Sequence, residues 1–592
     1  MMDNQFTDEQ INYINSSIDK HIFLEACPGS GKTEVVAAKL AKEIYIWNKR
    51  PGGIAVLSFA NSATEELIKR VSKYCNAGQS IYPHFIGTFD SFIYKNIVSP
   101  LATELTNYTG TGNDATIRIV EPSAQMGYRT KYSYAKRGNI HAHHYSHNLR
   151  SGGIIFETGD AVFDRALNTL KLENWQIQDF SETKRRMLDG GFATYRDIEY
   201  LALRALNEER FKHFVSLLAK RYPLIIIDEC QDLSEEQLTI LQILLNQGTK
   251  LQFVGDLHQA IYGFREVEPA RVKKFIIDNN FNILELTRNF RSCQNIVNLC
   301  AKLTGRNNIN GNVTWLDPRC LVVQYQNSPT ELTDTFDSIC KNYNKNVIVS
   351  RGHSNLLKFQ TSENELNNIQ KLALAISIYN SDDMSMLTNS LQLFSEFIRH
   401  HLKESCKTKD FNCPYSVNSS ISWRKFLCAS LSYMNSIGLQ NMNISWSNWV
   451  KQAKSSIRIL SSKEFCPTNI SAALAPLASV NLTSPSGLAN KEVNSTLGTI
   501  SESTSLYGRS TIHGAKGETH DVTIVVSSTR SGKDSHWLDW LSDPKSEAAR
   551  FAYVASSRPQ HYLIWAVKTL KNEEKKKLEA IGFTVLPLDT NT

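Results

Sequence analysis

The sequence is poor in features that would place a protein in a membrane or in an oxidising compartment. No run of apolar residues approaches the roughly 20 that a helix needs to cross a bilayer. The opening stretch, MMDNQFTDEQ, lacks the basic patch and apolar core of a signal peptide. The 11 cysteines form no CxxC pair, which argues against a zinc or iron–sulfur site, and their odd number argues against a closed disulfide framework. We therefore expect a cytoplasmic protein with no membrane partner.

Charge of either sign is not in large excess. The 592 residues carry a net charge of +7, which is too small to identify a nucleic-acid-binding protein by itself. Hydrophobic residues make up 41% and charged residues 21%, as in ordinary soluble globular proteins. The length suggests about four domains or subdomains.

One stretch, from Pro122 to Phe156, contains no acidic residue. It interleaves cations with tyrosines: Arg129, Lys131, Lys136, Arg137 and Arg150 with Tyr128, Tyr132, Tyr134 and Tyr145. This composition suits a groove for single-stranded DNA, but a solvated, partly disordered loop has it too, and both interpretations stay open. The stretch also holds four histidines: His141, His143, His144 and His147. Metal binding by them is disfavoured because no Cys or carboxylate completes a site.

Residues 21–44, HIFLEACPGSGKTEVVAAKLAKEI, predict a strand, a glycine-containing turn and an amphipathic helix. In such a turn successive backbone N–H groups can surround a phosphate, Lys32 can reach the outer phosphates, and the Thr33 hydroxyl can bind magnesium. The strict phosphate-loop pattern has glycine where this chain has Ala26, but the strand before the turn and the helix after it match the pattern. We therefore predict a nucleotide site formed by consecutive residues: Ala26, Cys27, Pro28, Gly29, Ser30, Gly31, Lys32 and Thr33.

A second apolar strand is predicted in YPLIIIDECQDLSEEQ, residues 222–237, where branched aliphatic residues lead into two adjacent acids. Such a run suits a strand buried on both faces of a parallel sheet, and ligands bind beyond the carboxyl ends of such strands. Adjacent carboxylates repel each other and need a cation or a proton when they are partly buried. Asp228 is therefore the expected magnesium ligand, and Glu229 is the expected base that orients the attacking water.

The N-terminal stretch FTDEQ allows two interpretations. Thr7 and Gln10 have the spacing of a capping box for the helix that follows. Gln10 also carries an amide donor and acceptor suited to the edge of an adenine. The local sequence favours the cap, and adenine binding is the alternative.

Several motifs follow one another in an order that resembles a known family. They are AVLSFANSATEELIKRV (55–71), GTFDSF (87–92), the acid strand, LQFVGDLHQAIYGFR (251–265), LTRNFRSCQNI (286–296), STIHGAKGETHD (510–521) and FAYVASSRPQHYLI (551–564). Together with the phosphate loop, and in this order, they resemble the UvrD/Rep/PcrA-like superfamily-one DNA helicases. The parts that carry motifs cover about half of the chain.

The resemblance implies an α/β fold with two RecA-like parallel-sheet motor domains that bind ATP between them, and two mainly helical insertions. It divides the chain into a first motor domain (1–95 and 190–284) with an insertion at 96–189, and a second motor domain (285–358 and 501–592) with an insertion at 359–500. At the end of the second insertion, residues 467–505 are rich in Ser, Thr, Ala and Asn, which predicts a flexible connector.

The resemblance also implies roles in ATP hydrolysis. Gln259 would bind a terminal phosphate or its attacking water. Arg291 and Arg558 would reach the γ-phosphate from the second motor domain, where charge develops in the transition state. Phe290 would stack on adenine. Glu518 stands one place earlier than the ribose-binding glutamate of the family and is the candidate for contact with the sugar.

For DNA the resemblance implies a set of contact positions: Phe59, Thr88, Tyr262, Phe264, Arg265 and His513. The aromatic rings would stack on bases, and the arginine would bind the strand. The family usually has Trp where Phe264 stands, so weaker stacking is expected there. By composition alone, Tyr262 and Phe264 would be ordinary core residues, and Phe59 is equally ambiguous.

The implied function is an ATP- and Mg²⁺-dependent 3′–5′ DNA helicase or translocase. More narrowly, the compact length and the wording of the motifs are similar to the helicase-like subunit of the Gabija anti-phage system, which works beside a separate nuclease-ATPase of the overcoming-lysogenization-defect (OLD) type. Only about 30 residues follow the last motif, so a nuclease domain is not expected there. A stand-alone repair helicase and a DNA-end-sensing, DNA-stimulated NTPase without productive unwinding are the alternatives. A small-molecule kinase with a phosphate loop is a further alternative, and the presence of Arg291 and Arg558 disfavours it.

Overall fold

The structure is a computed structural model, and its residues fall into two compact units. Unit 1 comprises residues 1–327, 349–352 and 510–592, and unit 2 comprises 328–348 and 353–509. The structure describes residues 6–49, 51–75, 80–110, 114–124, 126–134, 138–148, 153–261, 268–306, 308–313, 319–359, 367–381, 384–402, 411, 413–414, 416–417, 419–494, 507–532 and 534–588. Within these ranges no helix combines the length and the apolar character that crossing a bilayer requires.

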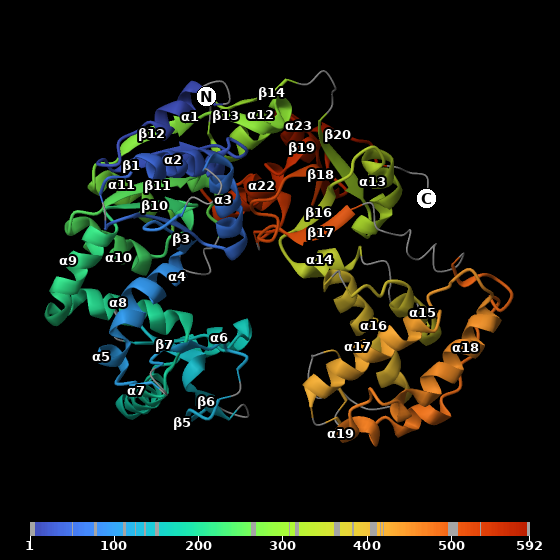
Figure 1. The fold of residues 1–592 in the computed structure, drawn as a ribbon. Helices are drawn as coiled ribbons and strands as arrows, with labels where there is room; N and C mark the ends of the chain where they lie inside the picture. The colour runs from blue at the N-terminus through green and yellow to red at the C-terminus, as the bar shows by residue number, and fades with distance from the viewer. Residues whose placement is uncertain are drawn as a thin grey trace. The chain divides into compact units, whose positions relative to one another are not determined.

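The first half of unit 1 is built on a six-stranded sheet whose strand pairs are all parallel (Figure 1). The strands lie in the order β12 (Asn282–Leu286), β1 (Ile22–Ala26), β11 (Lys250–Gly255), β10 (Leu224–Asp228), β2 (Ile54–Ser58) and β3 (Phe85–Thr88). Every residue of β10 is buried. Ile225 and Ile227 belong to one hydrophobic cluster, whereas Leu224 and Ile226 belong to another. Because neighbouring residues of a strand face opposite ways, both faces of the sheet are covered, and the apolar run of β10 has this cause.

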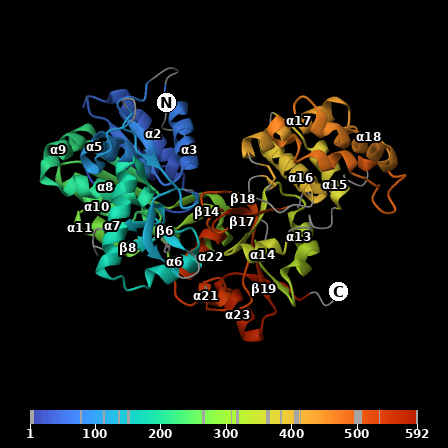
Figure 2. The same cartoon turned by 90° about the horizontal axis from the view of Figure 1, so that it is seen from below.

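Helices cover the two faces of this sheet. They are α1 (Asp8–Ile14), α2 (Lys32–Ile46), α3 (Asn61–Tyr74), α8 (Tyr195–Asn207), α9 (Lys212–Arg221), α10 (Glu235–Asn246) and α11 (Pro269–Asp278). The predicted capping box at the start of α1 is present, with Thr7 and Gln10 exchanging both hydrogen bonds. Helix α8 carries apolar residues at helical spacing and lies beside α10 (Figure 2).

A second six-stranded sheet has the order β17 (Tyr507–Thr511), β16 (Asn346–Ser350), β18 (His520–Val526), β19 (Pro559–Lys568), β15 (Cys320–Tyr325) and β20 (Thr584–Val585). Strand β15 pairs in parallel with β19 and β20, and β18 pairs in parallel with β19. Strands β16 and β17 carry the chain between unit 1 and unit 2. The α/β class predicted from the sequence is confirmed, and the predicted division into motor domains and insertions stays a prediction.

The acid-free stretch is folded where the structure describes it. Strands β5 (Arg129–Ser133) and β6 (Asn139–His141) form one antiparallel pair, and β7 (Tyr145–His147) and β8 (Ile154–Phe156) form another. Tyr145 is 1% exposed, and its hydroxyl donates to the Phe180 carbonyl at 2.7 Å. Tyr132 and Tyr134 also pack against phenylalanines of this small core. Since these rings are used for packing, the described part is neither a solvated loop nor a row of open stacking faces.

Some cations of this stretch lie outside the described residues, whereas its histidines are described and pack together. Lys136, Arg137 and Arg150 lie outside the described residues. His143 is buried, and its ring packs 4.3 Å from that of His144, centroid to centroid. Burial, and then the neighbouring histidines, lower the pKa of His143 to about 4. Among the described residues, no group of three or more His, Cys, Asp or Glu is arranged to hold a metal ion.

Unit 2 is mainly helical. Its long helices are α15 (Asn368–Ser377), α16 (Met384–Leu402), α17 (Ser420–Ser436) and α18 (Trp446–Ile459). The core contains Trp423, Trp446 and Trp449, all fully buried. The prediction of a flexible connector at 467–505 is wrong for its described part, because Ile470, Leu474, Leu477, Val480, Leu482 and Val493 are buried in the same core. Isolated apolar residues in a Ser- and Ala-rich stretch carry this packing, and an averaged composition hides them.

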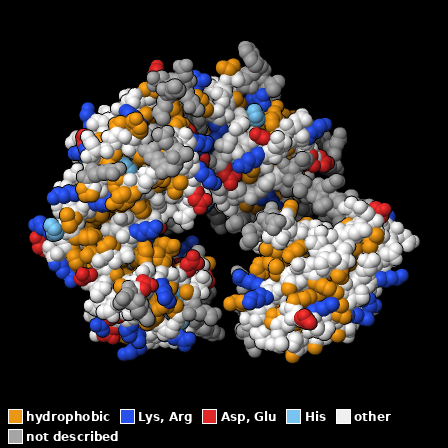
Figure 3. Space-filling model, in the orientation of Figure 1, with side chains coloured by type: hydrophobic (Ala, Val, Ile, Leu, Met, Phe, Trp, Pro, Cys, Tyr) orange, Lys and Arg blue, Asp and Glu red, His pale blue; other side chains and the backbone are white. Residues whose placement is uncertain are grey.

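On the face of unit 1 shown in Figure 3, Lys and Arg side chains are interspersed with Asp and Glu, so the described charges there do not gather into one basic field.

Of the 10 described cysteines, Cys75 and Cys428 are partly buried and the others are buried, and all 10 are free thiols.

Candidate active site

The phosphate-loop turn lies between β1 and α2, as the sequence predicts. Gly29 and Gly31 have φ values of +69° and +80°, a left-handed backbone that favours glycine. The Ser30 hydroxyl donates to the Cys27 carbonyl at 2.8 Å and closes the turn. The backbone N–H groups at the start of α2 have no carbonyl partner within the helix, and together with the helix dipole they favour an anion.

Strand β13 (Arg288–Cys293) lies directly against this turn. The Phe290 N–H donates to the Gly29 carbonyl at 2.9 Å. A Cβ added at Gly29 would come within 2.6 Å of the Arg291 Cβ, so this glycine is needed for close approach as well as for its φ. The contact brings Phe290 and Arg291 to the phosphate loop although more than 250 residues separate them in the sequence.

The two acids lie at the carboxyl end of β10. The Thr33 hydroxyl donates to Asp228 Oδ2 at 3.4 Å, and Asp228 is 4% exposed. Glu229 has a φ of +57°, a strained conformation for a residue with a side chain, and the Gln231 amide donates to its carboxylate.

The pKa values of the two adjacent acids are shifted in opposite directions. Burial, and then the charge of Glu229, raise the pKa of Asp228 to about 7. Burial also acts to raise the pKa of Glu229, but the charges of Lys32 and Lys516 outweigh it and lower that pKa. Hydroxyl and carboxylate oxygens are ligands that Mg²⁺ prefers, and a cation would offset the repulsion between the two acids, so Thr33 and Asp228 fit this ion.

The two predicted arginines converge on the same place from the second sheet and β13. Arg558, 2% exposed, donates from Nη2 to Gln259 Oε1 at 3.0 Å. Arg291 donates to Thr519 Oγ1 at 3.0 Å and to the Ser557 carbonyl at 3.1 Å. Burial, and then the charge of Arg558, lower the pKa of Arg291. A buried guanidinium and a partly buried one that lie close together favour an anion between them.

A buried network that the sequence reasoning missed holds Gln259 in place. Asp256 accepts from Gln259 Nε2 at 2.8 Å and from the Tyr553 hydroxyl at 3.1 Å, and it forms an ion pair with Arg306 at 3.2 Å. Burial acts to raise the pKa of Asp256, but Arg306 and Lys32 outweigh it and lower that pKa. The side chain of Gln259 is thus oriented with its nitrogen toward Asp256 and its oxygen toward Arg558. The only sequence signal was the place of Asp256 at the end of an apolar strand.

We expect Tyr553→Phe to lower DNA-stimulated ATP turnover by about 2–10-fold, the effect of one lost hydrogen bond. The reason is that Gln259 would lose part of its orientation while the phosphate loop stays intact. Nucleotide affinity should therefore not change. Steady-state kinetics and nucleotide titration check both statements, with Tyr45→Phe at an exposed tyrosine as the control. A loss confined to nucleotide affinity would contradict the role given to Tyr553.

Three other predicted nucleotide contacts, Gln10, Phe290 and Glu518, differ in what their side chains touch. Gln10 Nε2 donates to the Ser30 carbonyl at 3.0 Å, so this side chain both caps α1 and contacts the phosphate loop. Phe290 is 44% exposed, with the Arg288 guanidinium 5.3 Å from its ring, and it offers an open face beside the loop. Glu518 contacts His520 Nε2 at 2.9 Å, and its contact with a sugar stays a prediction.

The predicted DNA contacts are only partly described. Tyr262, Phe264 and Arg265 lie outside the described residues. His513 Nε2 lies 3.0 Å from the Ile261 carbonyl, at the point where the described chain stops. Phe59 and Thr88 line one cavity, and Thr88 also caps the short helix α4 (Phe89–Ile93) by accepting from the Ser91 N–H at 3.1 Å.

Comparison with known proteins agrees with this geometry. Residues 6–280, a little less than half of the chain, match the UvrD/REP helicase N-terminal domain. The chain is 24% identical over 315 residues to DNA helicase II of Haemophilus influenzae, which covers 51% of this chain and 40% of the relative. It is 28% identical over 280 residues to the Gabija protein GajB of Bacillus cereus (47% and 45%), and 27% identical over 314 residues to the mitochondrial ATP-dependent DNA helicase HMI1 of Saccharomyces cerevisiae (51% and 41%). The chain thus spans less than half the length of these curated relatives.

Proposed function

We propose that the protein is an ATP-dependent DNA helicase or translocase that moves 3′ to 5′ along single-stranded DNA. The observation that carries the proposal is the convergence of Arg291 and Arg558 on the phosphate loop and the acid pair. An ATPase that couples hydrolysis to motion needs groups from two walls around the triphosphate, because closing and opening of the walls is what can move a strand.

Each side chain has a distinct task in this proposal. Lys32 binds the outer phosphates, while Thr33 and Asp228 hold Mg²⁺. When bound, Mg²⁺ neutralises charge that develops on the phosphoryl oxygens. Glu229 stays ionised near neutral pH because nearby cations lower its pKa, so it can accept the proton of the attacking water.

The arginines act on the same reaction from the other wall. Arg291 and Arg558 stabilise the charge of the transferred phosphoryl group. Gln259 contacts Arg558 and stands two residues before Ile261, so it can report the state of the nucleotide to the predicted DNA contacts that follow. Phe290 stacks on adenine with its exposed face.

The similarities to known proteins support two biological settings. The similarity to GajB supports a role in anti-phage defence beside a separate OLD-type nuclease-ATPase, in the cytoplasm. The similarity to DNA helicase II supports a stand-alone repair helicase equally well. Co-purification of the protein with the product of a neighbouring nuclease gene distinguishes these settings.

A strand-displacement assay tests the proposed function. ATP turnover and displacement are measured on duplexes that carry a 3′ tail, a 5′ tail or no tail, with Lys32→Ala as the inactive control. We expect displacement from the 3′-tailed duplex alone. Turnover stimulated by DNA ends without any displacement would instead identify an end-sensing NTPase. Turnover that ignores DNA would overturn the proposal.

A further inference from the structure

A third arginine, Arg306, lies at the start of the phosphate loop. Its side chain is 11% exposed, and its Nη1 donates to the Ala26 carbonyl at 3.2 Å while lying 3.2 Å from Asp256 Oδ1. Because one nitrogen lies between two oxygens, the position of the guanidinium is fixed. Burial acts to lower the pKa of Arg306, but the charge of Asp256 outweighs it and raises that pKa. The side chain is therefore a permanent cation at this place.

Helix α12 (Gln294–Thr304) brings Arg306 to the phosphate loop. The helix begins shortly after Arg291 and ends shortly before Arg306. Val297 of this helix belongs to one small hydrophobic cluster with Cys27 of the phosphate loop. One helix, packed on the loop through its middle, thus has an arginine near each of its ends. This packing places Arg306 against Ala26 and Asp256, which lie far from it in the sequence.

Both oxygens of Asp256 accept hydrogen bonds. Oδ2 accepts from Gln259 Nε2 at 2.8 Å and from the Tyr553 hydroxyl at 3.1 Å. Oδ1 accepts from the His258 N–H at 3.1 Å and forms the ion pair with Arg306. A protonated carboxyl group would present a donor where these neighbours also present donors. The observed arrangement therefore requires an ionised Asp256.

An ionised Asp256 requires a cation that stays beside it. The residue is 0% exposed, and a buried carboxylate without a partner is strongly unfavourable. Burial acts to raise the pKa of Asp256, and the largest effect that lowers it is the charge of Arg306. Lys32 acts in the same direction, but in the proposed reaction its charge is shared with the phosphates of the nucleotide. Arg306 is thus the cation that remains with Asp256 throughout.

We propose that Arg306 is a positioning residue for ATP hydrolysis, which keeps Asp256 ionised so that Asp256 holds the amide nitrogen of Gln259. The oxygen of Gln259 then points to Arg558, from which it accepts at 3.0 Å. Without the cation, Asp256 would take up a proton, the Gln259 amide could rotate, and Arg558 would lose its acceptor. The inference rests on the proposed function and adds to it the residue on which the orientation of Gln259 depends.

Steady-state kinetics and nucleotide titration of Arg306→Gln test the inference in the full chain. DNA-stimulated ATP turnover should fall by about 10–100-fold, as expected when hydrogen bonds to a charged group are lost. Affinity for a fluorescent nucleotide should stay within about threefold of the wild type, because Lys32 and Thr33 are unchanged. Damage to the fold of the phosphate loop would instead weaken nucleotide binding as well.

Two further variants separate the role of the charge from that of packing. Arg306→Lys keeps a cation beside Asp256 and should recover turnover to within about fivefold of the wild type. Arg306→Gln combined with Asp256→Asn should be within about threefold of the slower single variant, because both changes disturb the same contact of Gln259. The combined variant leaves no unpaired buried charge, so it should fold even if Arg306→Gln does not.

Lys302→Gln is the matched control, because it removes a cation from an exposed position on the same helix. Its turnover should equal that of the wild type. Three results would overturn the inference while the proposed function stands: near-normal turnover by folded Arg306→Gln, turnover by folded Arg306→Lys as slow as that of Arg306→Gln, or a combined loss equal to the product of the single losses. A wild-type protein without ATP turnover would overturn both.

Discussion

Glu229→Gln is expected to reduce DNA-stimulated ATP turnover by about 10²–10⁴-fold, the usual contribution of a general base. Nucleotide affinity should stay within about threefold of the wild type, because Lys32, Thr33 and Asp228 remain in place and the substitution keeps the size of the side chain. Steady-state hydrolysis and titration with a fluorescent nucleotide measure the two quantities separately. The Gln231 amide that contacts Glu229 can also contact a glutamine, so the local fold should persist.

Glu235→Gln is the control for this variant. It removes a carboxylate a few residues further on, at the first turn of α10 and outside the acid pair. Its turnover should equal that of the wild type. If Glu229→Gln hydrolyses ATP at a near-normal rate, Glu229 is not the base, and the other acid of the pair becomes the candidate.

Arg558→Ala should lower turnover by about 10³–10⁵-fold, as expected for an arginine that stabilises the transferred phosphoryl group. Two effects combine in this variant. The transition state loses a guanidinium, and Gln259 loses the partner of its oxygen. Arg558→Lys should restore part of the charge but not the contact geometry, so its turnover should lie between those of Arg558→Ala and the wild type.

The readout must separate catalysis from folding, because Arg558 is buried. Thermal unfolding of each variant gives the stability, and nucleotide titration shows whether the ground-state complex still forms. Arg530→Ala, at an exposed arginine in the same half of unit 1, is the control. A folded Arg558→Ala variant that turns over ATP as fast as this control would end the role proposed for Arg558.

Local patterns allowed the phosphate loop and the acid strand to be predicted. A strand, a turn and a helix follow directly in the sequence, and β10 is apolar at consecutive positions because clusters cover both of its faces. The capping box of α1 was predictable for the same reason. Each depends on residues a few positions apart, so a short window contains all the necessary information.

The long-range parts of the site were not readable from local patterns. The contact between Phe290 and Gly29 depends on how β13 is placed against β1, and only the family resemblance suggested it. Arg306 and Tyr553 both contact Asp256. Nothing in the sequence predicts that the segments carrying these residues lie together. A lone arginine or tyrosine has many possible surroundings, and only the three-dimensional arrangement selects one.

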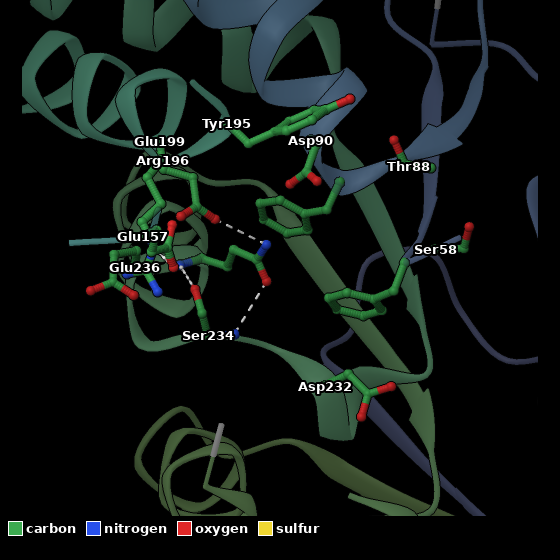
Figure 4. A pocket seen from close by; sticks show the side chains of 13 residues that line it. Ser58, Thr88, Asp90, Glu157, Tyr195, Arg196, Glu199, Asp232, Ser234 and Glu236 are labelled. Atoms are coloured by element: carbon green, nitrogen blue, oxygen red, sulfur yellow. Dashed lines mark hydrogen bonds and ion pairs between the residues drawn. The ribbon is translucent and has the colours of Figure 1, made fainter. Parts of the chain in front are cut away.

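The acid-free stretch shows how composition can mislead. Tyr145 and its neighbours have the residue types of a nucleic-acid groove, but their rings fill a small core with Phe180. Tyrosine is amphipathic, so the same residue can stack on a base or pack with its hydroxyl bonded to a carbonyl. The cavity lined by Phe59 and Thr88 was not predicted, because its lining residues come from segments that are far apart in the sequence (Figure 4).

The distribution of thiols makes the native chain suited to single-molecule spectroscopy. Cys75 lies in unit 1 and Cys428 in unit 2, and these are the described cysteines that are not fully buried. Once Cys406, outside the described residues, is replaced by serine, maleimide dyes should react first at these two positions. Energy transfer between the dyes would then follow the separation of the two units through each catalytic cycle, without an engineered cysteine.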